Sequence, residues 1–175
     1  TAENLAEKYN LSREEVDKFA IASQQNWAKA HAAGHFTDEI APVSIKTRKG
    51  MVEMTADEHP KPQTTLEQIA KLPTVFKKGG VVTAASASGI CDGAGAVIIA
   101  SEEAVAKHGL TPLARIAGYG LAGCEPTIMG IGPVPAIRAM LEKNGVSLGQ
   151  VDQIEINEAF GAQTLACAKE LDIPL

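Results

Sequence analysis

Asn157 and Glu158 are the first candidates for chemistry, because they stand where a predicted strand, residues 153–156, passes into a predicted final helix. In open α/β folds, ligands bind at the carboxyl ends of strands, where loop and helix amides are free. A carboxylate in the first turn of a helix also complements the helix dipole, and an asparagine can cap a helix. From position alone, the structural interpretation of this pair is therefore favoured over a functional one.

A second candidate is the segment 79–95, which is dense in Gly, Ala and Ser. Small residues in such numbers let another backbone or a ligand come close. Within it, Ser86, Ala87, Ser88 and Gly89 could form a cradle for a phosphate or carbonyl group. The run lacks the lysine and spacing of a P-loop and the spaced glycines of a dinucleotide turn, so a tight turn is the preferred interpretation.

The histidines and cysteines predict neither a metal site nor a nucleophile. His31 and His35 are four residues apart near a predicted helix end, but no third ligand lies near them in sequence. Cys91, Cys124 and Cys167 form no CxxC pair and lack the electropositive neighbours that activate a thiolate. Their odd number and wide spacing favour free thiols in a reducing compartment.

Composition limits the remaining function classes. The 175 residues carry 16 Lys+Arg against 21 Asp+Glu, a formal net charge of −5, with 45% hydrophobic and 4% aromatic residues. This acidic balance argues against nucleic-acid binding, which needs clustered cations. No apolar run approaches the roughly 18 residues of a membrane-spanning helix. A packed α/β interior built from small and aliphatic side chains fits these numbers best.

Periodicity and capping signals predict the elements that position these residues. From residue 94 onward, predicted strands and helices alternate as in a layered α/β domain, whereas the first ninety residues do not share that rhythm. The predicted helices cover residues 2–9, 12–33, 65–72, 101–109 and 130–143, and residues 157–160 lead into a last helix that ends near 171. The predicted strands cover 41–47 and 51–55, as a hairpin, and 96–100, 113–119 and 153–156.

Four runs together resemble the thiolase family: VVTAASASG at 81–89, DGA at 92–94, IMGIGPVPA at 128–136 and NEAF at 157–160. Their order and spacing match, and the similarity extends over essentially the whole chain. NEAF is the most specific of them, since the decarboxylating ketosynthases share the fold but use other residues there. The runs at 62–67 and 111–116 are most similar to the mitochondrial-type 3-ketoacyl-CoA branch of the family.

The resemblance implies an α/β, thiolase-like layered αβαβα fold, present only in part. The family stacks two similar halves into five layers and inserts a large loop domain in the first half. On that plan, residues 1–90 would be part of the CoA-binding loop domain. Residues 91–111 would end the N-terminal half, and residues 112–175 would begin the C-terminal half.

The resemblance also implies a site for coenzyme A, which is a substrate here, with no permanently bound cofactor and no metal. Asn157 would hold a water that stabilises the enolate oxygen during carbon–carbon bond cleavage. Six further residues would contact CoA or its acyl group: Ser88, Ala84 and Phe76 along the pantetheine, Lys61 at the nucleotide end, Met129 by the acyl pocket and Phe160 by the thioester.

The family's remaining catalytic groups are expected outside these residues. Its nucleophilic cysteine would precede Thr1, and its Gly-His-Pro histidine and Cys-x-Gly cysteine would follow Leu175. One local departure is Ala85-Ser86, where relatives commonly carry Gly-Asn. The expected function is therefore a portion of a thiolase that transfers acyl groups between CoA thioesters in fatty-acid β-oxidation through an acyl-cysteine. The 175 residues alone are expected to be inactive.

Two alternatives stay open at this point. One is a biosynthetic acetoacetyl-CoA thiolase, and the other is a non-catalytic CoA-binding or scaffold protein on a truncated thiolase fold. By resemblance, the whole protein is expected to be a homodimer or homotetramer that binds CoA thioesters. Its expected compartment is the mitochondrial matrix, with the cytoplasm as the alternative.

Overall fold

Local capping defines the two helices that begin the chain. The computed structural model describes residues 1–175 in full, with α1 at Ala2–Lys8 and α2 at Arg13–Ala32. The Ser12 hydroxyl accepts from the Glu15 N–H at 3.2 Å, and the Glu15 carboxylate accepts from the Ser12 N–H at 2.7 Å. Gly34, with φ of +79°, follows the helix in the left-handed conformation. Both predicted helices are confirmed.

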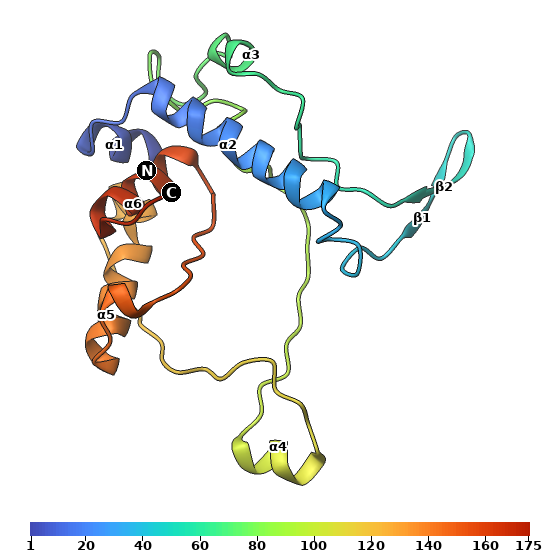
Figure 1. Ribbon diagram of the computed structural model, residues 1–175. Helices are drawn as coiled ribbons and strands as arrows, with labels where there is room; N and C mark the ends of the chain where they lie inside the picture. Colours follow the sequence, from blue (N-terminus) through green and yellow to red (C-terminus); the bar gives the residue numbers. More distant parts are fainter.

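The hairpin and the third helix also form where the sequence predicts them. Strands β1, Val43–Thr47, and β2, Gly50–Met54, pair antiparallel with Ile45 opposite Val52. Helix α3, Leu66–Ala70, starts after Thr65, whose side chain accepts from the Gln68 N–H. In Figure 1 the hairpin projects from the end of α2, away from the other helices.

The second part of the chain contributes α4 at Glu102–His108, α5 at Pro133–Asn144 and α6 at Gly161–Leu171. The 3-10 helices η1, Pro126–Ile131, and η2, Leu148–Gln150, lie between them. Gly109 and Gly145 end α4 and α5 with φ of +60° and +63°, the conformation that glycine adopts without strain. The final helix begins at Gly161, directly after residues 157–160, which the sequence predicts to lead into it, so that prediction is confirmed.

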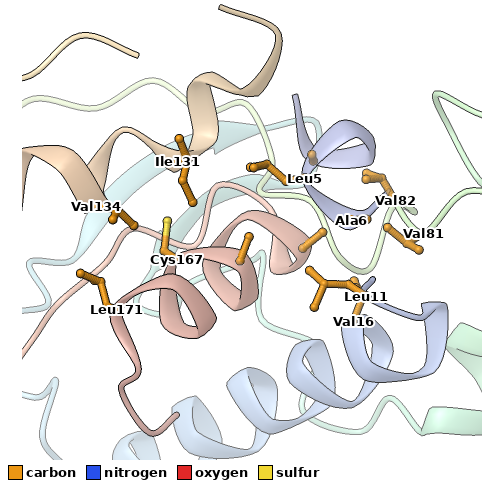
Figure 2. Packing of buried hydrophobic residues seen from close by; sticks show 13 residues of the cluster. Leu5, Ala6, Leu11, Val16, Val81, Val82, Ile131, Val134, Cys167 and Leu171 are labelled. Atoms are coloured by element: carbon orange, nitrogen blue, oxygen red, sulfur yellow. The ribbon is translucent and has the colours of Figure 1, made fainter. Parts of the chain in front are cut away.

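The core joins the two ends of the chain. Helix α6 packs against α1, α2, α5 and η1, and its apolar residues meet Leu5, Val16 and Val134, all at most 2% exposed. Figure 2 shows the Cys167 sulfur of α6 close to the side chains of Ile131 and Val134. Because N- and C-terminal segments share this core, both termini lie beside α6 (Figure 1).

Three predicted strands, 96–100, 113–119 and 153–156, are wrong for this structure, in which the hairpin is the only sheet. The segment 96–100, predicted to be buried, leaves Val97 85% and Ile98 92% exposed. A strand exists only through hydrogen bonds to a neighbour, and within the 175 residues no other strand pairs with these segments. Instead they run as long irregular segments, two of them leading to and from α4 (Figure 1). No helix has both the length and the apolar character needed to cross a membrane.

Candidate functional site

Residues 86–88 lie alongside residues 159–161, the end of the segment that leads into α6. The Ser88 N–H donates to the Ala159 carbonyl at 3.0 Å, and the Gly161 N–H donates to the Ser86 carbonyl at 2.9 Å. Ala87 and Phe160 face each other across this short antiparallel bridge. Two runs that are distant in sequence, SASG and NEAF, therefore form one structural unit.

The upstream end of the small-residue segment is anchored to α1. The Glu3 carboxylate accepts from the Val81 N–H at 3.0 Å and from the Val82 N–H at 2.9 Å. Ser86 is buried, and its hydroxyl accepts from the Thr83 N–H at 3.0 Å. Ser86 thus stabilises the loop through a hydrogen bond within residues 83–86, whereas Ser88 is exposed.

Helix α2 supplies the opposite wall of the site. Ala20, Ser23 and Trp27 lie on one face of the helix, since residues three and four apart share a face. Gly161 fits against this helix because a Cβ there would come within 3.2 Å of Phe19 Cδ1. Further along, the Ser23 hydroxyl donates to the Glu158 carboxylate at 2.7 Å. The helix therefore contacts the NEAF segment at two points.

Residues 58–72 form the third wall. The Lys61 N–H donates to Gln24 Oε1 at 2.5 Å, and Lys61 Nζ donates to the Glu58 carbonyl at 2.7 Å. His59 packs against Gly89, where a Cβ would lie 2.5 Å from His59 Cε1, so a larger residue at that position would displace the imidazole. Figure 1 shows this segment passing beside α2 on its way to α3.

Helix α3 is tied to α2 by Arg13, which also forms an ion pair within α2. Arg13 contacts the Asp17 carboxylate at 2.8 Å, and Asp17 is only 2% exposed. The same guanidinium donates to the Ile69 carbonyl at 2.7 Å. One arginine thus compensates the buried charge and satisfies a carbonyl at the end of α3.

The three walls enclose an open cavity of about 800 Å³, a volume in the range of small-molecule sites. Four of the seven residues expected to act at a CoA site line it: Lys61, Ala84, Ser88 and Asn157. Phe76 and Phe160 meet edge to face, with ring centroids 6.3 Å apart, beside the bridge that carries Ser88. Met129 is not brought to this cavity; it lies on η1 and is 64% exposed.

Asn157 does not cap the final helix. The N-cap position of α6 belongs to Phe160, and the Asn157 side chain makes no hydrogen bond to any protein group. Glu158 likewise lies before the first turn of α6, and its carboxylate is bound by Ser23 instead. Both structural interpretations offered by the sequence are therefore wrong. The structure leaves the Asn157 amide free to bind a ligand or a water in the cavity.

Histidine and cysteine side chains contribute no obvious catalyst. The His31 ring stacks on Trp27 with a centroid distance of 4.8 Å. Cys91 and Cys124 are exposed, whereas Cys167 is buried in α6, and burial raises the pKa of its thiol. A raised pKa disfavours the thiolate, so Cys167 is a packing residue, as its apolar neighbours in sequence predict. No three His, Cys, Asp or Glu side chains are grouped where they could hold a metal.

Sequence reasoning missed much of the cavity lining, including Ser23, Gln24, Trp27 and His59. Ser23 and Trp27 follow Val16 and Ala20 at helical spacing and share their face of α2. The signal that could have separated them from core positions is polarity. Val16 and Ala20 on the same face are buried, while the later positions are more polar and only half-buried.

Comparison with known proteins agrees with this geometry. The model of the thiolase N-terminal domain matches residues 1–103, and that of the thiolase C-terminal domain matches residues 110–175. The mitochondrial 3-ketoacyl-CoA thiolase of Mus musculus is 61% identical over 173 residues, 99% of this chain and 44% of that protein. The chain thus spans less than half the length of this curated relative.

Solved structures give the same result for the fold. The crystal structure of human mitochondrial 3-ketoacyl-CoA thiolase is matched with a TM-score of 0.93 and 61% identity, over 99% of this chain and 44% of that one. A structure of the human enzyme in complex with CoA is matched with a TM-score of 0.90 and 60% identity, over 99% and 43%. The partial thiolase fold expected from the sequence is confirmed. With two family models covering nearly all of its length, the chain belongs to the thiolase family.

Proposed function

We propose that these residues form the CoA-binding wall and one oxyanion-stabilising element of a 3-ketoacyl-CoA thiolase. The observation that carries this proposal is the unpaired Asn157 amide in the same cavity as Ser88 and Lys61. The 61% identity to the mouse enzyme and the CoA-bound human structure support the choice of substrate class.

In the proposed reaction, a cysteine thiolate attacks the C3 carbonyl of a 3-oxoacyl-CoA, and the C2–C3 bond breaks. The electron pair of that bond leaves as the enolate of acetyl-CoA, which takes a proton at C2. The sulfur of free CoA then attacks the acyl-cysteine and releases an acyl-CoA and the thiolate. Asn157 acts in the first step, where its amide orients a water that donates to the enolate oxygen. The thiolate and the proton-transfer groups belong to parts of the enzyme outside these residues.

The remaining residue assignments follow the same proposal. Ser88 and Ala84 contact the pantetheine where the bridge to NEAF begins, and the Phe76 and Phe160 rings form its apolar side. Lys61, exposed at the cavity edge, faces the nucleotide end, where its ammonium complements phosphate. Met129 contributes to the acyl pocket from η1.

The domain division is proposed on the same basis. Residues 1–90 belong to the loop domain, 91–111 end the N-terminal half, and 112–175 begin the C-terminal half. The gap between the two family models, at 104–109, supports a junction in this region. The exposed apolar residues of the segment 96–100 support the assignment of that segment as a sheet strand completed by the rest of the enzyme.

Assembly and compartment are proposed by relationship. We expect a homodimer or homotetramer in the mitochondrial matrix, since the mouse and human relatives are mitochondrial thiolases. Size-exclusion chromatography with light scattering and immunolocalisation of the complete gene product test these two expectations separately.

The test of function uses the complete gene product. Thiolysis of a 3-oxoacyl-CoA series is followed by the loss of absorbance of the magnesium enolate, with the 175 residues alone as the inactive control. We expect turnover that requires CoA and exceeds that of the 175-residue control by orders of magnitude. A complete protein that binds CoA without cleaving any 3-oxoacyl-CoA would support a CoA-binding scaffold and overturn the proposal.

A further inference from the structure

Glu158 carries a negative charge next to the residue proposed to stabilise a negative oxygen. Such a neighbour is unfavourable for an oxyanion site unless its orientation and charge are controlled. In the structure one side chain contacts this carboxylate: the Ser23 hydroxyl donates to Glu158 Oε2 at 2.7 Å. That distance lies at the short, charge-assisted end of the hydrogen-bond range.

The orientation of Ser23 is informative in itself. A serine in the interior of a helix commonly donates back to the carbonyl four residues earlier. Ser23 lies in the middle of α2, yet its hydroxyl donates across to NEAF rather than to Phe19. Ser23 is half-buried and Glu158 is exposed, so this hydrogen bond lies at the solvent-facing side of the cavity.

The NEAF segment is therefore held from both sides. On one side the Ser88 N–H donates to the Ala159 carbonyl at 3.0 Å, which fixes the backbone two residues after Asn157. On the other side α2 holds Gly161 by packing and Glu158 through Ser23. Of these contacts, the Ser23 bond is the side-chain contact nearest in sequence to Asn157.

We propose that Ser23 is a positioning residue for the oxyanion element. By binding the Glu158 carboxylate, it fixes that charge against the cavity wall formed by α2 and limits the directions available to the neighbouring Asn157 amide. The inference rests on the proposed thiolase function, and it adds α2 to the parts of the chain that affect the chemical step.

The test compares variants of the complete enzyme. Ser23→Ala removes the donor with a residue that favours helix, so folding is preserved. Ser23→Thr keeps the hydroxyl, and Gln25→Ala, on the exposed face of the same helix, is the matched control. Glu158→Gln keeps an acceptor oxygen, whereas Glu158→Ala removes it.

We expect Ser23→Ala to lower kcat about tenfold. This effect is smaller than that of removing a group in direct contact with the reacting atoms, because here the Asn157 amide is only misplaced. KM for CoA and the melting temperature should stay at the wild-type values. Ser23→Thr and Glu158→Gln should keep most of the activity, and Gln25→Ala all of it. Ser23→Ala and Glu158→Ala remove the same hydrogen bond. The kcat of the double variant should therefore be no lower than that of the slower single variant.

Two results would overturn the inference: wild-type kcat in Ser23→Ala, or effects of Ser23→Ala and Glu158→Ala that multiply in the double variant. Hydrogen exchange at residues 157–160, measured on the same proteins, tests the tether apart from turnover. Faster exchange in Ser23→Ala supports the tether even if the wild-type enzyme shows no thiolase activity, and that outcome would count against the proposed function alone. Unchanged exchange would reject the tether whatever the activity.

Discussion

Replacing Asn157 tests the proposed oxyanion element most directly. In the complete enzyme, Asn157→Ala removes an amide that makes no protein hydrogen bond, from a residue exposed in the cavity. The substitution therefore breaks no folding interaction, and the melting temperature should not change. The loss should appear only when negative charge builds on the enolate oxygen.

The expected magnitude follows from comparable sites. Removing one oxyanion donor costs about a hundredfold or more in kcat, and a factor of a hundred corresponds to about 2.7 kcal/mol of transition-state stabilisation. Since Asn157 acts through a water, we use the lower end of this range of kcat losses. We therefore expect kcat to fall about a hundredfold, with KM close to the wild-type value. Asn157→Asp should be at least as slow, because a carboxylate would repel the developing charge and would lie beside that of Glu158.

The assay is steady-state thiolysis of acetoacetyl-CoA, together with thermal unfolding of each variant. Single-turnover acylation of the cysteine is measured in parallel, since in this family that step relies on a different oxyanion hole and should be largely spared. A helix-capping asparagine would behave in the opposite way. Ala would then cost about 1 kcal/mol of stability, and Asp would substitute well. An Asp variant with near wild-type kcat would refute the catalytic assignment.

Three further predictions concern binding, packing and pH in the complete enzyme. Lys61→Glu should raise KM for CoA severalfold with kcat nearly unchanged, since a nucleotide contact is equal in ground and transition states; a defect in kcat alone would remove Lys61 from the CoA site. Leu5→Ala should lower the free energy of unfolding by about 2–5 kcal/mol in urea titration, because Leu5 is fully buried under α6; a loss below 1 kcal/mol would show that the core collapses to fill the space. The Tyr9 hydroxyl and Arg138 lower the pKa of Glu170, and burial together with the Glu170 bond raises the pKa of Tyr9 to about 12. The stability contributed by the ionised Glu170 carboxylate should therefore be lost as pH falls below the normal pKa range of Glu. The stability contributed by the neutral Tyr9 phenol should be lost as pH rises from about 10 to 12. Glu170→Gln should flatten the acid limb of stability measured by urea titration, and an unchanged acid limb would rule out this group as its source.

Helix ends were the part of the fold that sequence reasoning predicted best, for a local reason. Ser12, Thr65 and Ser101 cap α2, α3 and α4 with their own side chains, so each start depends on residues within one turn. Gly109 and Gly145 end their helices in a conformation that few other residues adopt. None of these signals needs information from a distant part of the chain.

Strands were predicted poorly because a strand depends on a partner. The residues 43–47 find theirs at 50–54 through a tight turn, so the hairpin forms within one stretch of sequence. The residues 96–100 have equally apolar side chains but no neighbour among the 175 residues. The apolar pattern correctly indicates an extended segment, but it carries no information about whether the pairing edge is present.

For the site, the amino-acid sequence alone shows which residue types are available and which motifs they belong to. The assignment of Ser88 and Asn157 to one CoA site came from the order of the motifs in the family, without any distance. The folded structure is needed to show that the Asn157 side chain has no protein hydrogen-bond partner and that Glu158 binds Ser23, because both facts depend on where α2 and α6 pack. A capping role and a catalytic role place the same residue at the same position in sequence. They differ only in which groups lie within hydrogen-bond distance of its side chain, and those groups come from elements far apart along the chain.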